Sequence, residues 1–205
     1  MQVAIAGAHG KIAMPLTRLL RARGDTVVGL IRNADHAAEV EAQGARPRVC
    51  DLERADVEEI AEAIGGAEAA IFAAGAGPGS GAERKLTMDR DGAIKLLRAA
   101  EQAGAQRYLV ISSLGAESPP APDDQEVFSV YLRAKAQADE AVMQSDIDWT
   151  ILRPGPLTDD RAKDRVRLGP DPFRTEITRQ DVAALIDALI HDSRAAGRVL
   201  YAGGG

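Results

Sequence analysis

Short apolar runs alternate along the chain with longer stretches of helical periodicity. Seven runs rich in β-branched residues predict strands, at residues 3–6, 26–31, 46–50, 68–73, 107–112, 148–153 and 198–202. The amphipathic stretches between them predict helices near residues 11–23, 35–43, 54–64, 82–103, 125–145 and 179–191. Several strands are apolar at nearly every position, so helices should cover both of their faces. The alternation predicts an α/β chain with a doubly wound, mainly parallel sheet of about seven strands.

Three segments interrupt this alternation, at residues 73–83, 115–126 and 154–174. Open α/β sheets bind ligands outside the carboxyl ends of their strands, and each of these segments follows a predicted strand. We therefore expect the three segments to form the walls of a pocket. Residues 1–205 should form a single domain, with residues 154–178 as its small substrate-side region.

Acidic pairs occur in two of these segments, at Asp123 with Asp124 and at Asp159 with Asp160. Carboxylates in loops are most often solvated turn residues. We therefore expect no metal site.

Composition narrows the classes of partner. The chain has 205 residues, 25 of them basic and 31 acidic, and its net charge of −6 should repel nucleic acid and acidic membrane surfaces. Its single cysteine, Cys50, cannot form an internal disulfide, which favours a reducing compartment. The first residues lack the features of a signal peptide, and no apolar run approaches the ~20 residues that cross a bilayer. We expect a cytoplasmic protein whose partner is a small molecule.

A glycine-rich turn follows the first predicted strand, with Gly7, Gly10 and Ala13 at GxxGxxA spacing. Gly7 permits a tight turn, Gly10 lets the backbone approach a diphosphate, and Ala13 lets the next helix pack close to the sheet. The N-terminus of that helix presents free N–H groups and a positive dipole end to an anion. Its place between a strand and a helix favours a Rossmann-type dinucleotide site over a purely structural turn. The residues of this turn expected to contact the cofactor are Gly7, His9, Gly10, Lys11 and Ile12.

The end of the second predicted strand distinguishes the two dinucleotides. NAD sites usually carry an acidic residue there for the ribose 2′-hydroxyl, whereas this chain has Arg32 followed by Asn33. A guanidinium can hold a 2′-phosphate with two hydrogen bonds, which predicts NADP in preference to NAD. The alternative is a solvated arginine. After the third strand, Asp51, next to Leu52, either accepts a hydrogen bond from adenine or caps the helix that begins near Glu53.

A tyrosine and a lysine share one face of the predicted helix at 125–145. Tyr131 and Lys135 are four residues apart, so their side chains leave the helix about one turn from each other. A nearby ammonium favours the phenolate form of a tyrosine and so makes proton exchange accessible. Coincidental spacing in an amphipathic helix is the alternative. Ser113, at the end of the fifth strand, adds a hydroxyl that could bind a substrate carbonyl. The ends of the fourth and fifth strands add four expected cofactor contacts, Ala73, Ala74, Gly75 and Ser112.

Together these motifs resemble the short-chain dehydrogenase/reductase superfamily over essentially the whole chain. Residues 88–116, 131–140 and 149–160 resemble its atypical branch more narrowly, whose relatives include biliverdin or flavin reductases, NmrA-like redox sensors and epimerase-like proteins. The resemblance implies that Tyr131 is the general acid/base and that Lys135 holds the ribose and activates the tyrosine. It also implies that Ser113 orients the substrate carbonyl. A further segment matches the lining of the nicotinamide, at Arg153, Pro154 and Gly155.

Two positions depart from the common pattern of that superfamily. Asp89 stands where many members carry Asn, and an anion near Lys135 would pair with its ammonium and reduce its influence on Tyr131. His9 replaces the usual Thr of the glycine motif, and it either approaches the phosphates or faces solvent.

The function predicted from these residues is an NADP(H)-dependent oxidoreductase. It would transfer hydride to or from a small carbonyl-type or flat substrate, with Tyr131 handling the proton. A non-catalytic NADP(H) sensor and an epimerase-like enzyme are the alternatives. The epimerase is disfavoured because the chain after residue 153 is too short for a large sugar-nucleotide lobe. The chain is expected to be a monomer or a homodimer.

Overall fold

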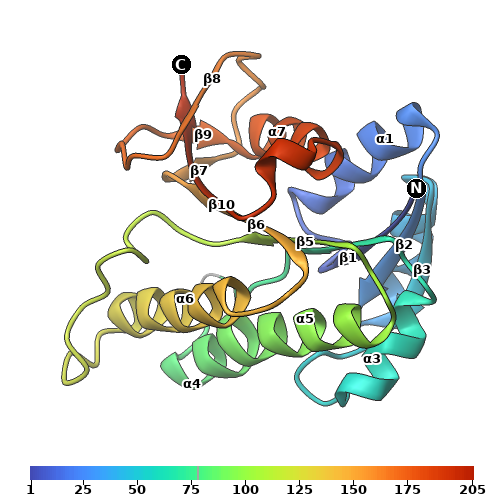
Figure 1. Ribbon diagram of the computed structural model, residues 1–205, viewed down its shortest axis with the longest axis horizontal. Helices are drawn as coiled ribbons and strands as arrows, with labels where there is room; N and C mark the ends of the chain where they lie inside the picture. Colours follow the sequence, from blue (N-terminus) through green and yellow to red (C-terminus); the bar gives the residue numbers. More distant parts are fainter. Residues whose placement is uncertain (78) are drawn as a thin grey trace.

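An eight-stranded sheet forms the centre of the molecule (Figure 1). The computed structural model describes residues 1–77 and 79–205. The strand order is β3-β2-β1-β4-β5-β6-β10-β8, and β8 (Val166–Gly169) is antiparallel to β10. The other strands pair in parallel, and they are β1 (Gln2–Ala6), β2 (Thr26–Ile31), β3 (Ala45–Val49), β4 (Ala69–Phe72), β5 (Arg107–Ile111), β6 (Asp148–Pro154) and β10 (Arg198–Gly204). The order reverses between β1 and β4, which is where doubly wound sheets bind their ligands.

Helices cover both faces of this sheet, as Figure 1 shows. One layer contains α3 (Val57–Ile64), α4 (Ala82–Arg84), the π-helix η2 (Lys85–Gly92), α5 (Ala93–Gln102) and α6 (Val127–Met143). The opposite layer contains α1 (Ala13–Arg23), α2 (Ala37–Ala42) and α7 (Arg179–His191). Shorter elements are the 3₁₀ turns η1 (Ala34–His36) and η3 (Ser193–Ala195), and a separate pair of parallel strands, β7 (Leu157–Thr158) and β9 (Ile177–Thr178).

The core has two halves, one on each face of the sheet. On β1, Val3 and Ile5 pack with α1 and α7, whereas Ala4 and Ala6 pack with α3 and α5, and all four residues are fully buried. Successive residues of a strand point to opposite faces, so a strand buried on both sides must be apolar throughout. The predicted mainly parallel Rossmann-type sheet is therefore confirmed.

Three differences from the sequence-based expectation affect the main sheet and its covering helices. The eighth strand, β8, lies inside the predicted loop 154–174, and it is mostly exposed and antiparallel, so it has no apolar run to reveal it. The predicted helix 82–103 contains the π-helix η2 between α4 and α5. The helix predicted from residue 54 begins at Val57, because Asp56 caps it in a reciprocal capping box. Within the described residues, no helix is both long and apolar enough to cross a membrane.

Candidate functional site

The turn after β1 is shaped by two glycines. Gly7 has a φ of +78°, and a Cβ on it would lie 2.7 Å from the Cα of Ala74, so only glycine fits where the loops after β1 and β4 meet. Gly10 lines both cavities described below, so its backbone is open to a ligand. Helix α1 follows, and no side chain caps its N-terminus. The N–H of Met14 already bonds to the carbonyl of Gly10 at 3.0 Å and Pro15 has no N–H, so among the first three helical residues it is Ala13 whose N–H is available to an anion, fewer groups than the sequence predicts. The turn therefore fits the dinucleotide cradle that its spacing predicts.

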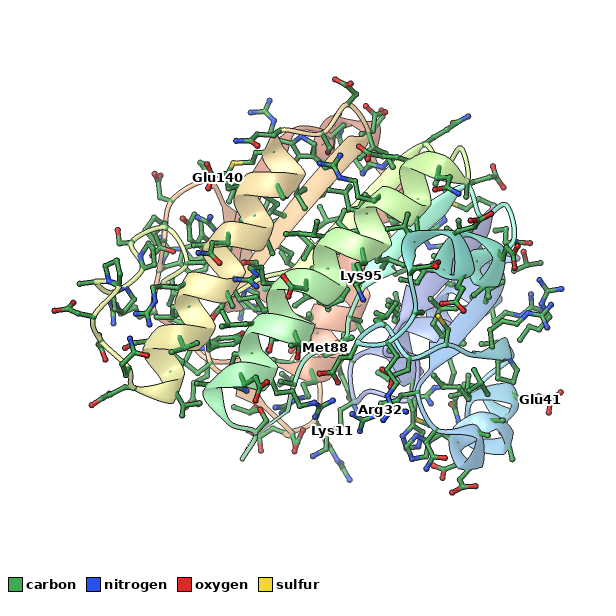
Figure 2. The ribbon with its side chains drawn as sticks, turned by 90° about the horizontal axis from the view of Figure 1, so that it is seen from below. Lys11, Arg32, Glu41, Met88, Lys95 and Glu140 are labelled. Carbon is green, nitrogen blue, oxygen red and sulfur yellow. The ribbon has the colours of Figure 1, made fainter. Side chains whose placement is uncertain are left out.

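A first cavity, here called the arginine cavity, has a volume of about 300 Å³ and lies at the carboxyl ends of β1 to β4. Many of the predicted cofactor residues line it, namely Gly7, His9, Gly10, Arg32, Asn33, Asp51, Leu52, Ala73, Ala74 and Gly75. Figure 2 labels Arg32 and Lys11 close together toward the lower side of the view, away from Glu140 on α6. The structure thus gathers residues from four separate strand ends around one space.

Two guanidiniums share one carboxylate beside this cavity. Arg84 donates from Nε and Nη2 to Glu53 Oε2 at 3.0 Å, and Arg32 Nη1 lies 3.6 Å from the same oxygen. Burial raises the pKa of Glu53, but the hydroxyl of Thr87 and the two arginines outweigh burial and hold the pKa below its ordinary value. Glu53 therefore stays ionised and holds Arg32 and Arg84 at the mouth of the cavity.

His9 and Asp51, for each of which the sequence leaves two roles open, both line the arginine cavity. His9 lines it and stacks on His36, with ring centroids 3.8 Å apart, while its Nε2 lies 3.0 Å from a carboxylate oxygen of Glu39. Asp51 lines it too, and its Oδ1 accepts the backbone N–H of Glu53 at 3.1 Å. That bond closes a turn before α3, so the carboxylate of Asp51 is not the cap of this helix.

A second cavity, here called the tyrosine cavity, has a volume of about 780 Å³. It contains Tyr131 and Lys135 from α6, and it shares Gly10, Ala73, Ala74 and Gly75 with the arginine cavity. The remaining residues of its lining are Lys11, Ile12, Gly77, Gly79, Ser80, Lys85, Asp89, Ile111, Ser112, Val127, Phe128, Leu157 and Arg179. Because the two cavities share Gly10 and residues 73–75, they lie next to each other at the end of the glycine turn and of β4, and the two together are here called the crevice.

Lys135 is nearly buried beside Tyr131. Its Nζ lies 5.8 Å from the centroid of the Tyr131 ring and donates to the carbonyl of Ile111 at 2.9 Å. Asp89 Oδ1 lies 3.5 Å from the same nitrogen, and Asp89 Oδ2 accepts the N–H of Ala76 at 3.2 Å. The expected pairing of Asp89 with Lys135 is therefore present, and it places a compensating negative charge next to the ammonium.

The serines at the end of β5 point to different partners. Ser112 lines the tyrosine cavity and donates to Asp139 Oδ2 at 2.7 Å, whereas Ser113 donates to the carbonyl of Leu114 at 3.1 Å. Arg153 donates from Nε to the same oxygen of Asp139 at 3.0 Å. Within the described part of the chain, four predicted site residues do not line either cavity: Ser113, Arg153, Pro154 and Gly155. The carbonyl-orienting role of Ser113 and the nicotinamide-lining role of residues 153–155 stay predictions.

Burial dominates the electrostatics of Asp139 and Arg153. Burial raises the pKa of Asp139, and the hydrogen bonds from Ser112 and Arg153 offset only part of this effect. Burial lowers the pKa of Arg153, but the charge of Asp139 and the hydrogen bond to Tyr201 outweigh it, so the pKa is raised. Arg153 is thus a buried, charged group that braces β6 against α6 and β10.

Several residues that line the two cavities are not among the predicted site residues. Phe128 lies three residues before Tyr131 on α6, so its place on the same helix face could have been found from that spacing. Lys85, Arg84 and Arg179 come from distant segments, and no motif marks them. Their positions depend on how η2 and α7 pack, which the local sequence does not encode.

Comparison with known proteins matches residues 7–193 to the model of the NAD(P)H-binding family. The uncharacterized sugar epimerase YhfK of Bacillus subtilis is 34% identical over 199 residues, which cover 97% of this chain and 92% of YhfK. Among solved structures, a Bacillus halodurans protein provisionally named an NAD-dependent epimerase/dehydratase has a TM-score of 0.91 and 33% identity, covering 100% of this chain and 94% of that protein. ChuY, an anaerobillin reductase from Escherichia coli O157:H7, has a TM-score of 0.83 and 25% identity, covering 100% of this chain and 97% of ChuY. The chain is thus similar over nearly its full length to proteins named as epimerases and reductases.

Proposed function

Since the chain belongs to the NAD(P)H-binding family, as its resemblance to atypical short-chain dehydrogenases/reductases predicts, we propose that it is an NADP(H)-dependent oxidoreductase. One observation carries the proposal: the glycine turn and the Tyr131–Lys135 pair both line the crevice. A cofactor held by the turn would reach a proton-transferring group at the other end. A binding site alone would not need that group.

Each residue in the crevice has a distinct task in this reaction. When bound, the cofactor supplies the hydride. Tyr131 gives its hydroxyl proton to the substrate oxygen, so a carbonyl gains hydride at carbon and a proton at oxygen and becomes an alcohol as NADPH becomes NADP. Lys135, 5.8 Å from the ring centroid, favours the phenolate that remains on Tyr131, and its hydrogen bond to Ile111 fixes its position.

NADP is the cofactor that the arginine cavity supports. Arg32 and Arg84 present two guanidiniums that Glu53 holds in place, and both line the cavity. Guanidiniums bind phosphate with paired hydrogen bonds, and an NAD ribose offers no phosphate at this position. The second nucleotide, NAD, would leave both arginines without a ligand.

A second candidate function is a non-catalytic NADP(H) sensor, which the Asp89–Lys135 ion pair favours. At 3.5 Å the carboxylate competes for the ammonium that should activate Tyr131. Such a protein would bind the cofactor and pass no hydride. The epimerase-like alternative rests on the names of YhfK and the Bacillus halodurans protein.

Calorimetric titration with NADP and NAD, on the wild type and on Arg32→Asp, tests the cofactor. A hydrogen bond to a charged group contributes about 1.5–3 kcal/mol, and Arg32 is 56% exposed, so we expect the lower end, about tenfold weaker NADP binding. Arg98→Asp, which makes the same charge change outside both cavities, should bind NADP as the wild type does. Equal affinities of the wild type for NADP and NAD would remove the case for NADP.

Tyr131→Phe, assayed against a panel of carbonyl and quinone substrates with NADPH, tests the reaction. We expect cofactor binding to persist while turnover falls at least a hundredfold, because general acid–base catalysis contributes about 10²–10⁴-fold. Turnover that survives this substitution would exclude Tyr131 as the proton donor. Cofactor binding without turnover on any substrate in the wild type would favour the sensor.

A further inference from the structure

The tyrosine cavity is positively charged in a chain whose net charge is −6. Four basic side chains line it, Lys11, Lys85, Lys135 and Arg179. Asp89 is the acidic residue of this lining, as far as the described residues define it. A cavity with an excess of cations concentrates anionic ligands, since field lines focus in a cleft with low-dielectric walls.

Three of these cations are already held by carboxylates. Lys11 and Arg179 both contact Asp159, at 2.5 Å and 2.7 Å, and Lys135 lies 3.5 Å from Asp89. Within the described part of the chain, Lys85 has no carboxylate within 4.0 Å. Its Nζ donates to the carbonyl of Gly77 at 2.9 Å, which uses one of its three protons and leaves two for a ligand.

Lys85 also lies beside the group that would transfer the proton. Its Nζ is 5.5 Å from the centroid of the Tyr131 ring. A substrate whose carbonyl reaches the Tyr131 hydroxyl would therefore extend past Lys85 with its remaining atoms. An anionic group on that part of the substrate would meet the ammonium.

An apolar wall faces the same space. Phe128 is 64% exposed although it is a large hydrophobic side chain, and its ring centroid lies 5.9 Å from that of Tyr131 with the planes tilted by 31°. Val127 is 44% exposed next to it. Exposed apolar residues gathered at a cavity mark a binding surface, and two neighbouring rings favour a ligand that is itself flat and aromatic.

We propose that the substrate of this site is a flat aromatic or conjugated carbonyl compound that carries a carboxylate. The ring packs on Phe128, the carbonyl oxygen reaches the hydroxyl of Tyr131, and the carboxylate binds Lys85. Lys85 is then a specificity-determining residue for the reaction. This inference rests on the proposed oxidoreductase function, because Tyr131 defines where the carbonyl lies.

The test uses dead-end complexes, which need no turnover. The protein is first titrated with NADP, which tests the proposed function separately, and then saturated with NADP and titrated with 2-naphthoate or 2-naphthamide. The two probes have the same ring and differ in charge. Because a hydrogen bond to a charged group is roughly twice as strong as a neutral one, we expect naphthoate to bind about tenfold more tightly.

Variants then assign this preference to one side chain. Lys85→Met should reduce the preference for naphthoate to less than threefold, while Lys85→Arg should keep most of it. Lys163→Met is the matched control, because Lys163 is exposed and outside the cavity lining, and it should bind both probes as the wild type does. NADP affinity is measured for every variant and should stay constant, which shows that the crevice is intact.

Equal binding of the two probes to the wild type would overturn the proposal, as would an undiminished preference in Lys85→Met. If NADP itself fails to bind, the proposed function fails instead. A reductase assay with NADPH adds a kinetic readout, comparing 4-carboxybenzaldehyde with its methyl ester. The acid should have the lower KM, and a lower KM for the ester would contradict the assignment of Lys85.

Discussion

The buried ion pair between Asp139 and Arg153 offers a sharp test of how the crevice is supported. Asp139 Oδ2 accepts from Ser112 at 2.7 Å and contacts Arg153 Nη2 at 2.9 Å, and Asp139 itself is fully buried. Asp139→Asn keeps the shape of this side chain and removes its charge. Arg153, only 7% exposed, would then keep a buried positive charge without its main counterion.

The expected cost follows from what remains around Arg153. Removing one partner of a buried ion pair costs about 3–5 kcal/mol, because it leaves an uncompensated charge. Arg153 still donates to the hydroxyl of Tyr201 at 2.8 Å and lies 3.9 Å from Glu117, so we expect the lower end, about 3 kcal/mol. For a chain of this size, that loss lowers Tm by about 6–12 °C.

Urea and thermal unfolding of the wild type and Asp139→Asn measure this cost. Asp123→Asn is the control, because Asp123 is exposed and its carboxylate makes no ion pair within the described residues, so its Tm should match that of the wild type. The double variant Asp139→Leu/Arg153→Met should recover much of the loss, since it removes both buried charges. A loss below about 1 kcal/mol in Asp139→Asn, or a double variant less stable than the single one, would refute the reasoning.

Three further predictions address acid stability, thiol reactivity and the glycine turn. Burial raises the pKa of Asp25, but hydrogen bonds from the N-terminal ammonium and His191 outweigh it and hold the pKa below its ordinary value of 3.8. The stabilisation from Asp25 is therefore complete above pH 3.8 and is lost as the pH falls through the lower folded-state pKa. The Tm of Asp25→Asn should lie below that of the wild type at pH 6 and approach it below pH 3.8. A difference in Tm that stays constant with pH would contradict this. Burial raises the pKa of Cys50, so this thiol should react slowly with a thiol reagent at pH 7. Cys50 also lines the arginine cavity, so the reaction should be slower still with NADP present. A reaction rate that saturating NADP does not change would argue against a cofactor in that cavity. Gly7→Ala should abolish NADP binding and lower Tm. Gly24 also has a positive φ, +96°, but no atom lies within 4 Å of a new Cβ there, so Gly24→Ala should lose only about 1–2 kcal/mol of folding stability and keep NADP binding. NADP titration and thermal unfolding compare the two variants.

The sheet could be predicted from the sequence because its strands are buried on both faces. A strand such as β4 (Ala69–Phe72) is fully buried at every position, so its apolar run is visible without any tertiary information. The strand β8 has no such signal, since its stability comes from backbone pairing with β10 at an exposed edge. Likewise, η2 continues the helical pattern that predicts 82–103, so the pattern does not distinguish its π geometry, and η2 packs against α6 from a distant part of the chain. Local periodicity therefore revealed the elements whose burial is regular and missed those held by distant contacts.

The candidate site divides in the same way. Gly7 and Arg32 could be found because each follows a strand directly, and Gly10 because it lies in the turn between β1 and α1; strand ends in a parallel sheet meet at one edge. Arg84 and Lys85 reach that edge from a segment between β4 and β5, and their positions depend on the fold of α4 and η2. Sequence spacing therefore identifies site residues that directly follow strands. Site residues that belong to the helices covering the sheet can be identified only once the positions of those helices are known.

The carboxylates along the crevice connect its charge to its function. Glu53 holds Arg32, Asp159 holds Lys11, and Asp89 holds the lysine beside the tyrosine. Each carboxylate orders a cation before a ligand arrives, which lowers the entropic cost of binding, and each also competes with the ligand for that cation. Lys85 differs from these cations because a backbone carbonyl orders it without adding a negative charge. An anionic substrate group should therefore bind Lys85 at the lowest electrostatic cost, and this difference is why the matched naphthoate and naphthamide titrations should separate Lys85 from its neighbours.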